Sequence, residues 1–429
     1  MSLPRTFKQA SFKEFNGPLV IEEVTLQLPD DGEILVKVEA CGVCHSEVIA
    51  KYNAYGAGFP IVPGHEIMGK VAAVGNLVDG WNVGDPIAGC WHGGHDGTCE
   101  KCRQGLYQFC EPFIVNGITR NGGFGEYCII RAQAAVRVPA NMDPVRNAPM
   151  LCAGSTVFTA LKAAGIKTGD TVAVQGLGGL GHMAVQFARK MGYRVIAISR
   201  GRSKEASIRQ LGAHEYIDST AGDVGEALKN LGPAQLVLTT ALDTAAMIPL
   251  IKGIGIYGKL MILSFLQSGA MTIDSNELFM RGISIQSYPT GNCYDNQKTL
   301  EFAQMHGFDC VVEEFPLAKV QEAFDAVMNG KVRYRAVITM PIEVFLNNNY
   351  PALLDVLLSG NTDGDFNPLS VAVQSNDRAN AQLHEIFLAV ETGVTDMRQQ
   401  TAWLRDNIDT KDRSIAILTQ DLAEAAEKI

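Results

Sequence analysis

Two different periods of hydrophobic residues follow each other along the chain. From residue 18 onward, short runs of alternating polar and apolar residues are separated by Gly and Pro, and residues 33–38 form the clearest run. A period of two is typical of β-strands that are buried on one face. Further short strands are predicted at 70–74 and 85–88. Many short strands between glycine turns predict a partly open β-barrel.

The pattern changes after residue 156. Continuous apolar runs now alternate with helical patterns, of which residues 182–191 are one example. Strands that are apolar on both faces and alternate with helices predict a parallel sheet covered by helices on both sides. We therefore expect an α/β protein with a barrel-type part and a doubly wound parallel-sheet part. The strands predicted for the second part are 171–175, 194–198, 236–239 and 259–263.

A third pattern occupies the C-terminal residues. Residues 341–377 are rich in Asn, Gly and Asp, which is typical of a linker. Residues 378–429 contain no proline, and residues that are all apolar except Thr401 and Lys411 recur there at alternating intervals of four and three from Leu383 to Ile429. A sustained period of 3.5 favours a coiled coil and self-association. An amphipathic helical hairpin and a docking segment for another protein are alternatives.

Length, charge and cysteine content narrow the class of protein. A chain of 429 residues, 47% of them hydrophobic, is long enough for two or three domains. The net charge of −10 argues against a nucleic-acid partner. We expect no membrane span and a cytoplasmic location, because neither an apolar leader nor a run of 18 apolar residues is present. Three cysteines within residues 99–110 indicate metal binding rather than disulfides.

The first chemical candidate is a set of thiols and an imidazole. Cys44 precedes the group Gly64-His65-Glu66 by about twenty residues, and Cys152 lies much farther along the chain. Thiolate and imidazole are donors that zinc prefers, and a catalytic zinc ion takes three protein ligands. A single cysteine is more often a buried, inert thiol. The combination of Cys44, Gly64-His65-Glu66 and Cys152 therefore favours a zinc site in this part of the chain.

The second candidate is a glycine-rich loop between a predicted strand and a predicted helix. Gly176, Gly178 and Gly181 have the Gly-x-Gly-x-x-Gly spacing that binds a dinucleotide pyrophosphate. The helix that follows offers free N–H groups to the phosphates. We expect the whole loop to contact the cofactor, namely Gly176, Leu177, Gly178, Gly179, Leu180 and Gly181.

The turn after the next strand predicts which dinucleotide binds. An enzyme that uses NAD usually carries an acidic residue there for the ribose hydroxyl groups. This chain has Ser199, Arg200 and Lys204 in a turn without any acidic residue before Glu205. Hydroxyl and cationic groups suit a 2′-phosphate, so NADP(H) is favoured over NAD(H). A solvated basic turn that tolerates either cofactor is the alternative.

The segment from Gly64 to Val78 matches a known signature. Gly64-His65-Glu66 is followed by Gly69, Gly75 and Val78 at the spacing found in the zinc-containing medium-chain alcohol dehydrogenases. The sequence resembles that family over about residues 5–340. The resemblance implies the following domains: a GroES-like catalytic domain at 1–155, completed by 288–340, and a Rossmann cofactor domain at 156–287.

The resemblance also implies roles for single residues near the predicted zinc ion. Cys44, His65 and Cys152 match the zinc ligands, and Glu66 lies next to the metal as a supporting group or transient ligand. Ser46 matches the hydroxyl that relays a proton. His45 matches a residue that faces the cofactor pyrophosphate, and Thr156 matches a contact on the nicotinamide side. Backbone capping is the alternative for Ser46 and Thr156. At Ile49, the chain lacks the histidine that often ends the relay.

A second zinc ion is implied in the cysteine-rich segment. The family binds a structural zinc ion there with four cysteines, and this chain has Asp96, Cys99, Cys102 and Cys110 at the matching positions. A carboxylate can bind zinc, although it is a harder ligand than a thiolate. His92 or His95 are alternative fourth ligands. A segment with free thiols and no metal, or a redox switch, are further alternatives.

Together these features predict a zinc-dependent oxidoreductase. We expect it to transfer a hydride between NADP(H), or NAD(H), and a small alcohol, aldehyde or ketone, and to form a homo-oligomer. One alternative is a zinc-free quinone or enoyl reductase of the same superfamily, which the presence of Cys44, His65 and Cys152 disfavours. The other is a non-enzymatic scaffold that presents the C-terminal coiled coil.

Overall fold

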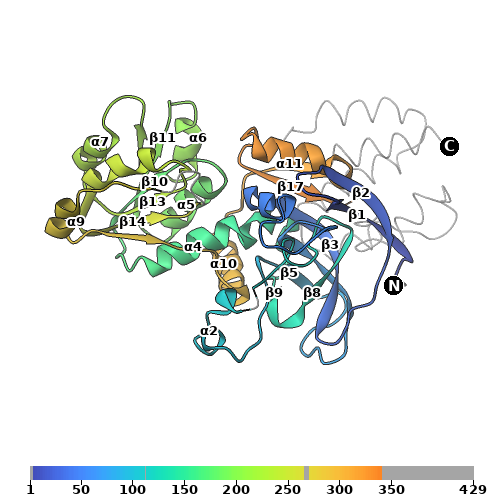
Figure 1. Ribbon diagram of the computed structural model, residues 1–429. Coiled ribbons are helices and arrows are strands. Elements are labelled where there is room, and N and C mark those ends of the chain that lie inside the picture. Colours follow the sequence, from blue (N-terminus) through green and yellow to red (C-terminus); the bar gives the residue numbers. More distant parts are fainter. Residues whose placement is uncertain (1–2, 112, 265–269, 341–429) are drawn as a thin grey trace, which may run out of the picture. The chain divides into compact units, whose positions relative to one another are not determined.

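The computed structural model describes residues 3–111, 113–264 and 270–340. Within these ranges the longer strands form two large sheets (Figure 1). The linker predicted at 341–377 and the coiled coil predicted at 378–429 lie outside the described residues. None of the helices in the described ranges is both long and apolar enough to cross a membrane.

The first sheet has seven strands and is organised around β3 (Glu33–Val43). This strand has 11 residues and pairs antiparallel with three others, because β8 and β17 pair with different parts of its length. Almost all of it is buried. Its partners are β4 (Glu66–Val74), β8 (Tyr127–Arg131) and β17 (Arg335–Thr339). The other strands of the sheet are β5 (Pro86–Gly89), β9 (Ala135–Arg137) and β16 (Val312–Pro316). The strands predicted at 33–38, 70–74 and 85–88 are confirmed as parts of this sheet.

The second sheet has six strands that all run parallel. Its order is β12-β11-β10-β13-β14-β15, so the chain reverses its direction of winding next to β10. Dinucleotides bind at such a switch point in doubly wound sheets. The strands are β10 (Thr171–Gln175), β11 (Arg194–Ser199), β12 (Glu215–Asp218), β13 (Ala234–Thr239), β14 (Ile254–Ile262) and β15 (Ser284–Ser287).

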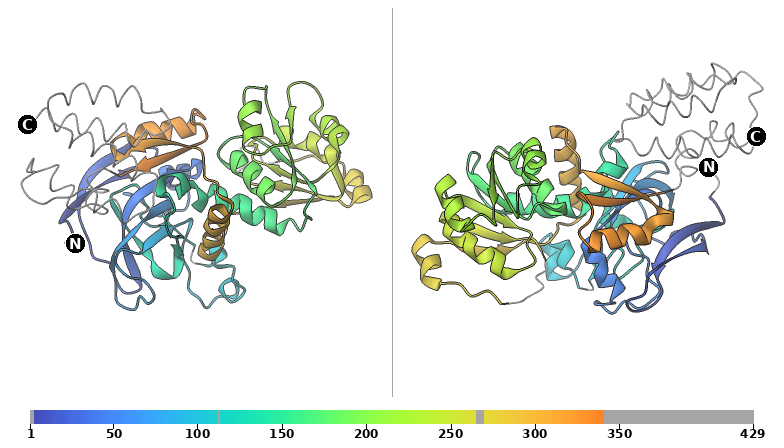
Figure 2. Two further views of the ribbon diagram at one scale, coloured as in Figure 1. Left: turned by 180° about the vertical axis from the view of Figure 1, so that it is seen from behind. Right: turned by 90° about the horizontal axis from the view of Figure 1, so that it is seen from above.

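Helices cover both faces of this parallel sheet, as its continuous apolar strands require (Figure 2). Val172 and Val174 of β10 face a core shared with α4 (Ala153–Ala163) and α5 (Gly179–Lys190). Ala173 faces the opposite core, which includes Leu228 of α7 (Val224–Leu231). The predicted α/β class with a doubly wound sheet is therefore confirmed. The helix predicted at 182–191 begins three residues earlier, because the glycine loop itself forms its first turn.

The end of the described chain returns to the first sheet. After β15, helix α10 (Cys293–His306) packs on β9, and β16, helix α11 (Val320–Met328) and β17 follow. Strand β17 lies antiparallel to β3, with Ala336 opposite Val43. The start of β17 is thereby placed beside the end of β3, where Cys44 follows.

Candidate metal and cofactor site

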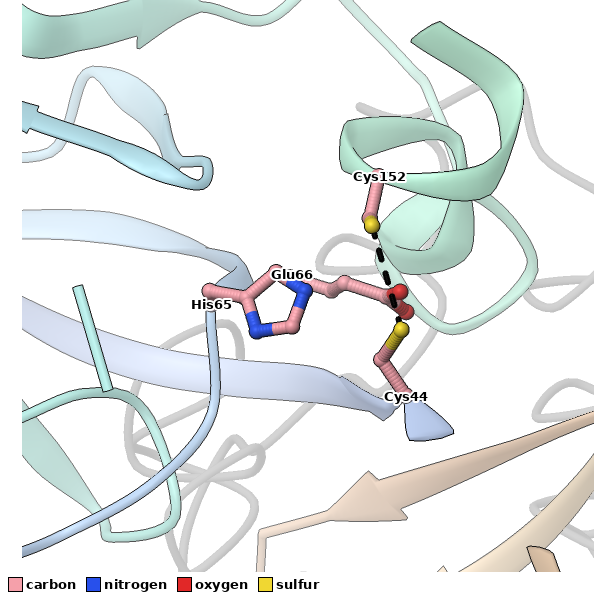
Figure 3. A group of neighbouring side chains, drawn as sticks. All are labelled: Cys44, His65, Glu66 and Cys152. Carbon is pink, nitrogen blue, oxygen red and sulfur yellow. Dashed lines mark hydrogen bonds between the residues drawn. The ribbon is translucent and has the colours of Figure 1, made fainter. Parts of the chain in front are cut away.

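Four metal-ligating side chains meet where β3 ends and β4 begins (Figure 3). One ligand atom from each of Cys44, His65, Glu66 and Cys152 lies within 4.8 Å of the other three. The Cys44 and Cys152 sulfur atoms are 3.9 Å apart, although the residues are separated by 108 positions. Two thiols, an imidazole and a carboxylate at this spacing form a donor set that suits zinc. The structure therefore brings together the residues predicted for the catalytic zinc site.

Local backbone features place each of these groups. The antiparallel register pairs Gly42 of β3 with Glu66 of β4, so the glutamate side chain passes directly over the glycine. A Cβ atom at Gly42 would lie 1.8 Å from Oε2 of Glu66, so only glycine fits there. Cys152 is the residue before α4, at the N-terminal end of that helix.

A buried carboxylate orients His65. The His65 Nδ1 atom lies 2.9 Å from Oε1 of Glu47, and both side chains are fully buried. This contact favours the proton on Nδ1 and leaves Nε2 as a metal ligand. Burial acts to lower the pKa of His65, but Glu47 and Cys44 outweigh it and raise that pKa well above its ordinary value. The sequence analysis missed Glu47, for which the only signal was an acidic residue three positions after Cys44.

The two thiols share their protons unequally. The hydrogen bond from Cys152 lowers the pKa of Cys44 well below its ordinary value, and the same contact raises the pKa of Cys152. Ser46 Oγ also lies 3.1 Å from the Cys44 sulfur. A thiolate is therefore favoured at Cys44. A divalent cation would replace the proton that the sulfur atoms now share.

Glu66 has one paired and one unpaired oxygen. Its Oε1 atom forms a buried ion pair with Arg335, the first residue of β17. Its Oε2 atom is buried without a hydrogen-bond partner. Burial raises the pKa of Glu66 to about 7 despite the opposing charge of Arg335. Buried polar atoms are usually satisfied, so an unpaired oxygen beside two thiols and an imidazole fits a bound cation.

The glycine loop follows β10 and forms the start of α5. Gly176 has a φ of 85°, and a Cβ atom there would lie 2.3 Å from Oγ1 of Thr240. A Cβ atom at Gly181 would lie 1.8 Å from the Gly176 oxygen, so helix and strand pack closely only with glycine. A Cβ atom at Gly178 would meet nothing within 4 Å, which leaves room for a ligand. Leu177 is buried and Leu180 packs against the core.

The turn after β11 contains the predicted 2′-phosphate residues. Lys204 Nζ donates a hydrogen bond of 3.1 Å to the Leu177 oxygen, so it lies at the glycine loop. Ser199 ends β11. Arg200 is exposed and has no polar partner among the described residues. Arg202, in contrast, forms a 2.8 Å ion pair with Glu205.

The other predicted cofactor residues lie around the metal-ligating cluster. His45 follows Cys44 directly and is exposed to solvent. Thr156 is buried in the first turn of α4, where its N–H donates to the Cys152 oxygen at 2.9 Å. Ser46 Oγ lies 3.5 Å from Nε2 of His65, inside the cluster.

A second cluster forms in the cysteine-rich segment. One ligand atom from each of Asp96, Cys99, Cys102 and Cys110 lies within 4.8 Å of the other three. Oδ1 of Asp96 accepts the N–H groups of Thr98 and Cys99, and these bonds lower the pKa of Asp96. The aspartate thus presents a charged carboxylate toward the thiols.

The two nearby histidines are not members of this second cluster. His95 Nδ1 lies 3.1 Å from Nε2 of His92, and their rings are stacked. The imidazoles therefore contact each other. Of the alternative fourth ligands, the geometry favours Asp96.

Comparison with known proteins agrees with this geometry. Residues 30–140 match the family model described as alcohol dehydrogenase GroES-like domain, and residues 179–305 match the one described as zinc-binding dehydrogenase. Alcohol dehydrogenase notN of Aspergillus sp. (strain MF297-2) is 54% identical over 340 residues, which cover 79% of this chain and 100% of the relative. Alcohol dehydrogenase patD of Penicillium expansum is 54% identical over 337 residues, which cover 79% of this chain and 98% of the relative.

A solved structure with the same fold is acetophenone reductase from Geotrichum candidum in complex with NAD. It is 28% identical, has a TM-score of 0.68, and the match covers 79% of this chain and 98% of that chain. The chain belongs to the zinc-containing medium-chain alcohol dehydrogenase family. It is an NAD(P)-dependent alcohol dehydrogenase, and neither the zinc-free reductase nor the scaffold is favoured.

Proposed function

We propose that this enzyme interconverts a small alcohol and its aldehyde or ketone with NADP(H), and that Cys44, His65 and Cys152 bind its catalytic zinc ion. One observation carries the proposal: the three ligand atoms converge, and Arg335 connects them with the loop that suits a dinucleotide. Arg335 contacts both the metal-ligating cluster and the glycine loop: it pairs with Glu66, and its Cδ atom would lie 2.8 Å from a Cβ atom at Gly179.

Each group in the cluster has a separate task. A zinc ion held there supplies a Lewis acid for the substrate oxygen, and the nicotinamide supplies or accepts the hydride. Glu47 orients His65, and the charge of Arg335 opposes the effect of burial on the pKa of Glu66. Ser46 Oγ, buried next to Cys44, is the hydroxyl that exchanges the proton of the alcohol. Ile49 carries no titratable group, so water or the ribose continues the relay.

The choice of NADP(H) rests on the turn after β11. Within the described part of the chain Arg200 has no polar partner, so its guanidinium is available to bind a 2′-phosphate in a charge-assisted contact. Asp218 of β12, which contacts this turn, accepts the Gly201 N–H at 2.8 Å and two bonds from Thr220. Its carboxylate is thereby occupied with the protein itself.

Two further assignments belong to this proposal. Asp96, Cys99, Cys102 and Cys110 hold a structural zinc ion, which the approach of their ligand atoms supports. The chain forms a homo-oligomer, for which the heptad pattern of residues 378–429 is the support.

The test is a screen of alcohols and aldehydes with NADPH, NADP⁺, NADH and NAD⁺, together with metal analysis of the same purified full-length protein. We expect turnover with at least one alcohol or aldehyde, a higher kcat/KM with NADP(H), and about two zinc ions per chain. A zinc-free protein that reduces activated alkenes would instead support the quinone or enoyl reductase. A protein without any turnover would support the scaffold.

A further inference from the structure

Tyr334, the residue before Arg335, contacts the two helices that follow the glycine loop and the turn after β11. It is only 7% exposed, and its side chain lies against α5 and α6 (Glu205–Gln210). Its ring stacks on His182 of α5, with ring centres 4.7 Å apart and an angle of 7° between the planes. Its hydroxyl lies 3.2 Å from Oγ of Ser207 in α6.

The direction of the hydrogen bonds follows from the partners of Ser207. The Ser207 hydroxyl donates to the Lys204 oxygen at 2.9 Å, so its proton is not available for Tyr334. Tyr334 therefore donates its proton to Ser207 Oγ. The Lys204 ammonium in turn donates to the Leu177 oxygen of the glycine loop. Three hydrogen bonds, two of them joined through the Lys204 side chain, thus connect Tyr334 with the glycine loop.

The ring of Tyr334 supports the other side of the same loop through His182. Nε2 of His182 accepts the Val311 N–H at 3.2 Å, so Nδ1 carries the proton and faces the Gly178 oxygen at 3.3 Å. Burial keeps this imidazole neutral, because it lowers the pKa of His182 to about 3. Stacking of Tyr334 on His182 holds the ring that contacts Gly178.

We propose that Tyr334 is a positioning residue for the cofactor: it holds the Lys204 turn and the glycine loop in one fixed spacing. Arg335, its neighbour in sequence, pairs with Glu66 in the metal-ligating cluster. Two consecutive residues, the first residue of β17 and the one before it, therefore support the cofactor loops and the metal-ligating cluster. The proposal rests on the proposed function, which places a dinucleotide between these loops. It predicts an effect on cofactor affinity and not on the chemical step.

The test is a double-mutant cycle on the zinc-loaded full-length enzyme. Tyr334→Phe keeps the stacked ring and removes only the hydroxyl, and Ser207→Ala removes its acceptor. Dissociation constants of NADPH and NADH are measured from the fluorescence of the bound nicotinamide. We expect each single variant to weaken NADPH binding about fivefold, and the double variant to be no weaker than the singles.

Two further readouts separate positioning from general damage. With saturating NADPH, kcat of Tyr334→Phe should stay within about twofold of the wild-type value. Tyr294→Phe is the matched control, because it removes the hydroxyl of a tyrosine that is 61% exposed, and it should leave cofactor affinity unchanged. Unchanged affinity in Tyr334→Phe, or fully additive losses in the double variant, would overturn the proposal.

Cofactor binding by the wild-type enzyme tests the preference for NADP(H) separately from the role of Tyr334. If the wild-type enzyme binds NADH as tightly as NADPH, the preference for NADP(H) has failed. The cycle is then run with NADH, where non-additive losses still support Tyr334 as the positioning residue and additive losses contradict it.

Discussion

Arg335 and Glu66 form a buried ion pair across 269 positions of sequence. The guanidinium belongs to β17, which reaches the site only because it lies antiparallel to β3. Glu66 is the first residue of β4, and its carboxylate lies near the two thiols and the imidazole of the cluster. The last strand of the described chain therefore contributes a charged side chain to the metal-ligating cluster.

The first prediction concerns this ion pair. Arg335→Met removes the positive charge that opposes the effect of burial, so we expect the pKa of Glu66 to rise further and a larger fraction of Glu66 to be protonated at neutral pH. Breaking a buried pair typically costs about 3–5 kcal/mol of stability. We also expect kcat/KM to fall at least about tenfold, measured at pH 7. Arg146→Met is the control, because that side chain is half exposed and its pair with Asp143 is 3.6 Å long. Equal losses in both variants would contradict a special role for Arg335.

The second prediction concerns cofactor choice. Arg200→Ala should raise KM for NADPH about tenfold or more and leave KM for NADH nearly unchanged, because a charge-assisted contact to the 2′-phosphate is lost. Arg202→Ala is the matched control in the same turn, since Glu205 already pairs with that guanidinium. The assignment of Arg200 fails if the two substitutions act equally, or if NADH is affected as strongly as NADPH.

The third prediction concerns the second cluster. Asp96→Cys supplies a softer ligand and should retain more zinc during dialysis against a chelator. Asp96→Ala should lose about one zinc ion per chain while the catalytic ion stays bound. Glu100→Ala removes another carboxylate from the same segment and serves as the control. Unaltered zinc content in Asp96→Ala would mean that this aspartate is not a ligand.

The fourth prediction concerns stability at mildly acidic pH. The pKa of His182 is lowered to about 3 by burial, so the folded protein keeps it neutral while the unfolded chain binds a proton below about pH 6.5. Acidification therefore favours unfolding, and this histidine contributes a loss of about 2 kcal/mol between pH 7 and pH 5. His182→Gln should be less stable at pH 7 and should show a flatter decline. Denaturant unfolding at both pH values, with zinc present, measures the difference, and parallel declines would contradict it.

Much of the fold was readable from the sequence because periodicity is a local property. Strand 171–175 is found as predicted, and the strand predicted at 259–263 begins five residues earlier, at Ile254. The cysteines and the histidine that meet in the clusters could also be selected from the sequence, because thiols and imidazoles are uncommon and their metal chemistry is specific. The proposed domain limits at 155 and 287 stay a prediction.

The partners of these donors could not be predicted in the same way. Arg335 and Tyr334 look like ordinary residues next to a strand, and only the pairing of β17 with β3 reveals their contacts. Glu47 is close to Cys44 in sequence, but its role depends on the backbone turn that aims it at His65. Side chains that act through other side chains have no signature of their own in one sequence.

The central claim is tested most directly by zinc content and activity in ligand variants. Cys44→Ser, His65→Ala and Cys152→Ser should each lose the catalytic zinc ion and lower kcat/KM by at least about a thousandfold, with the second zinc ion retained. Cys128→Ser, at a buried thiol outside both clusters, is the control and should keep both metal and activity. Full zinc content and wild-type turnover in any of the three ligand variants would contradict the account.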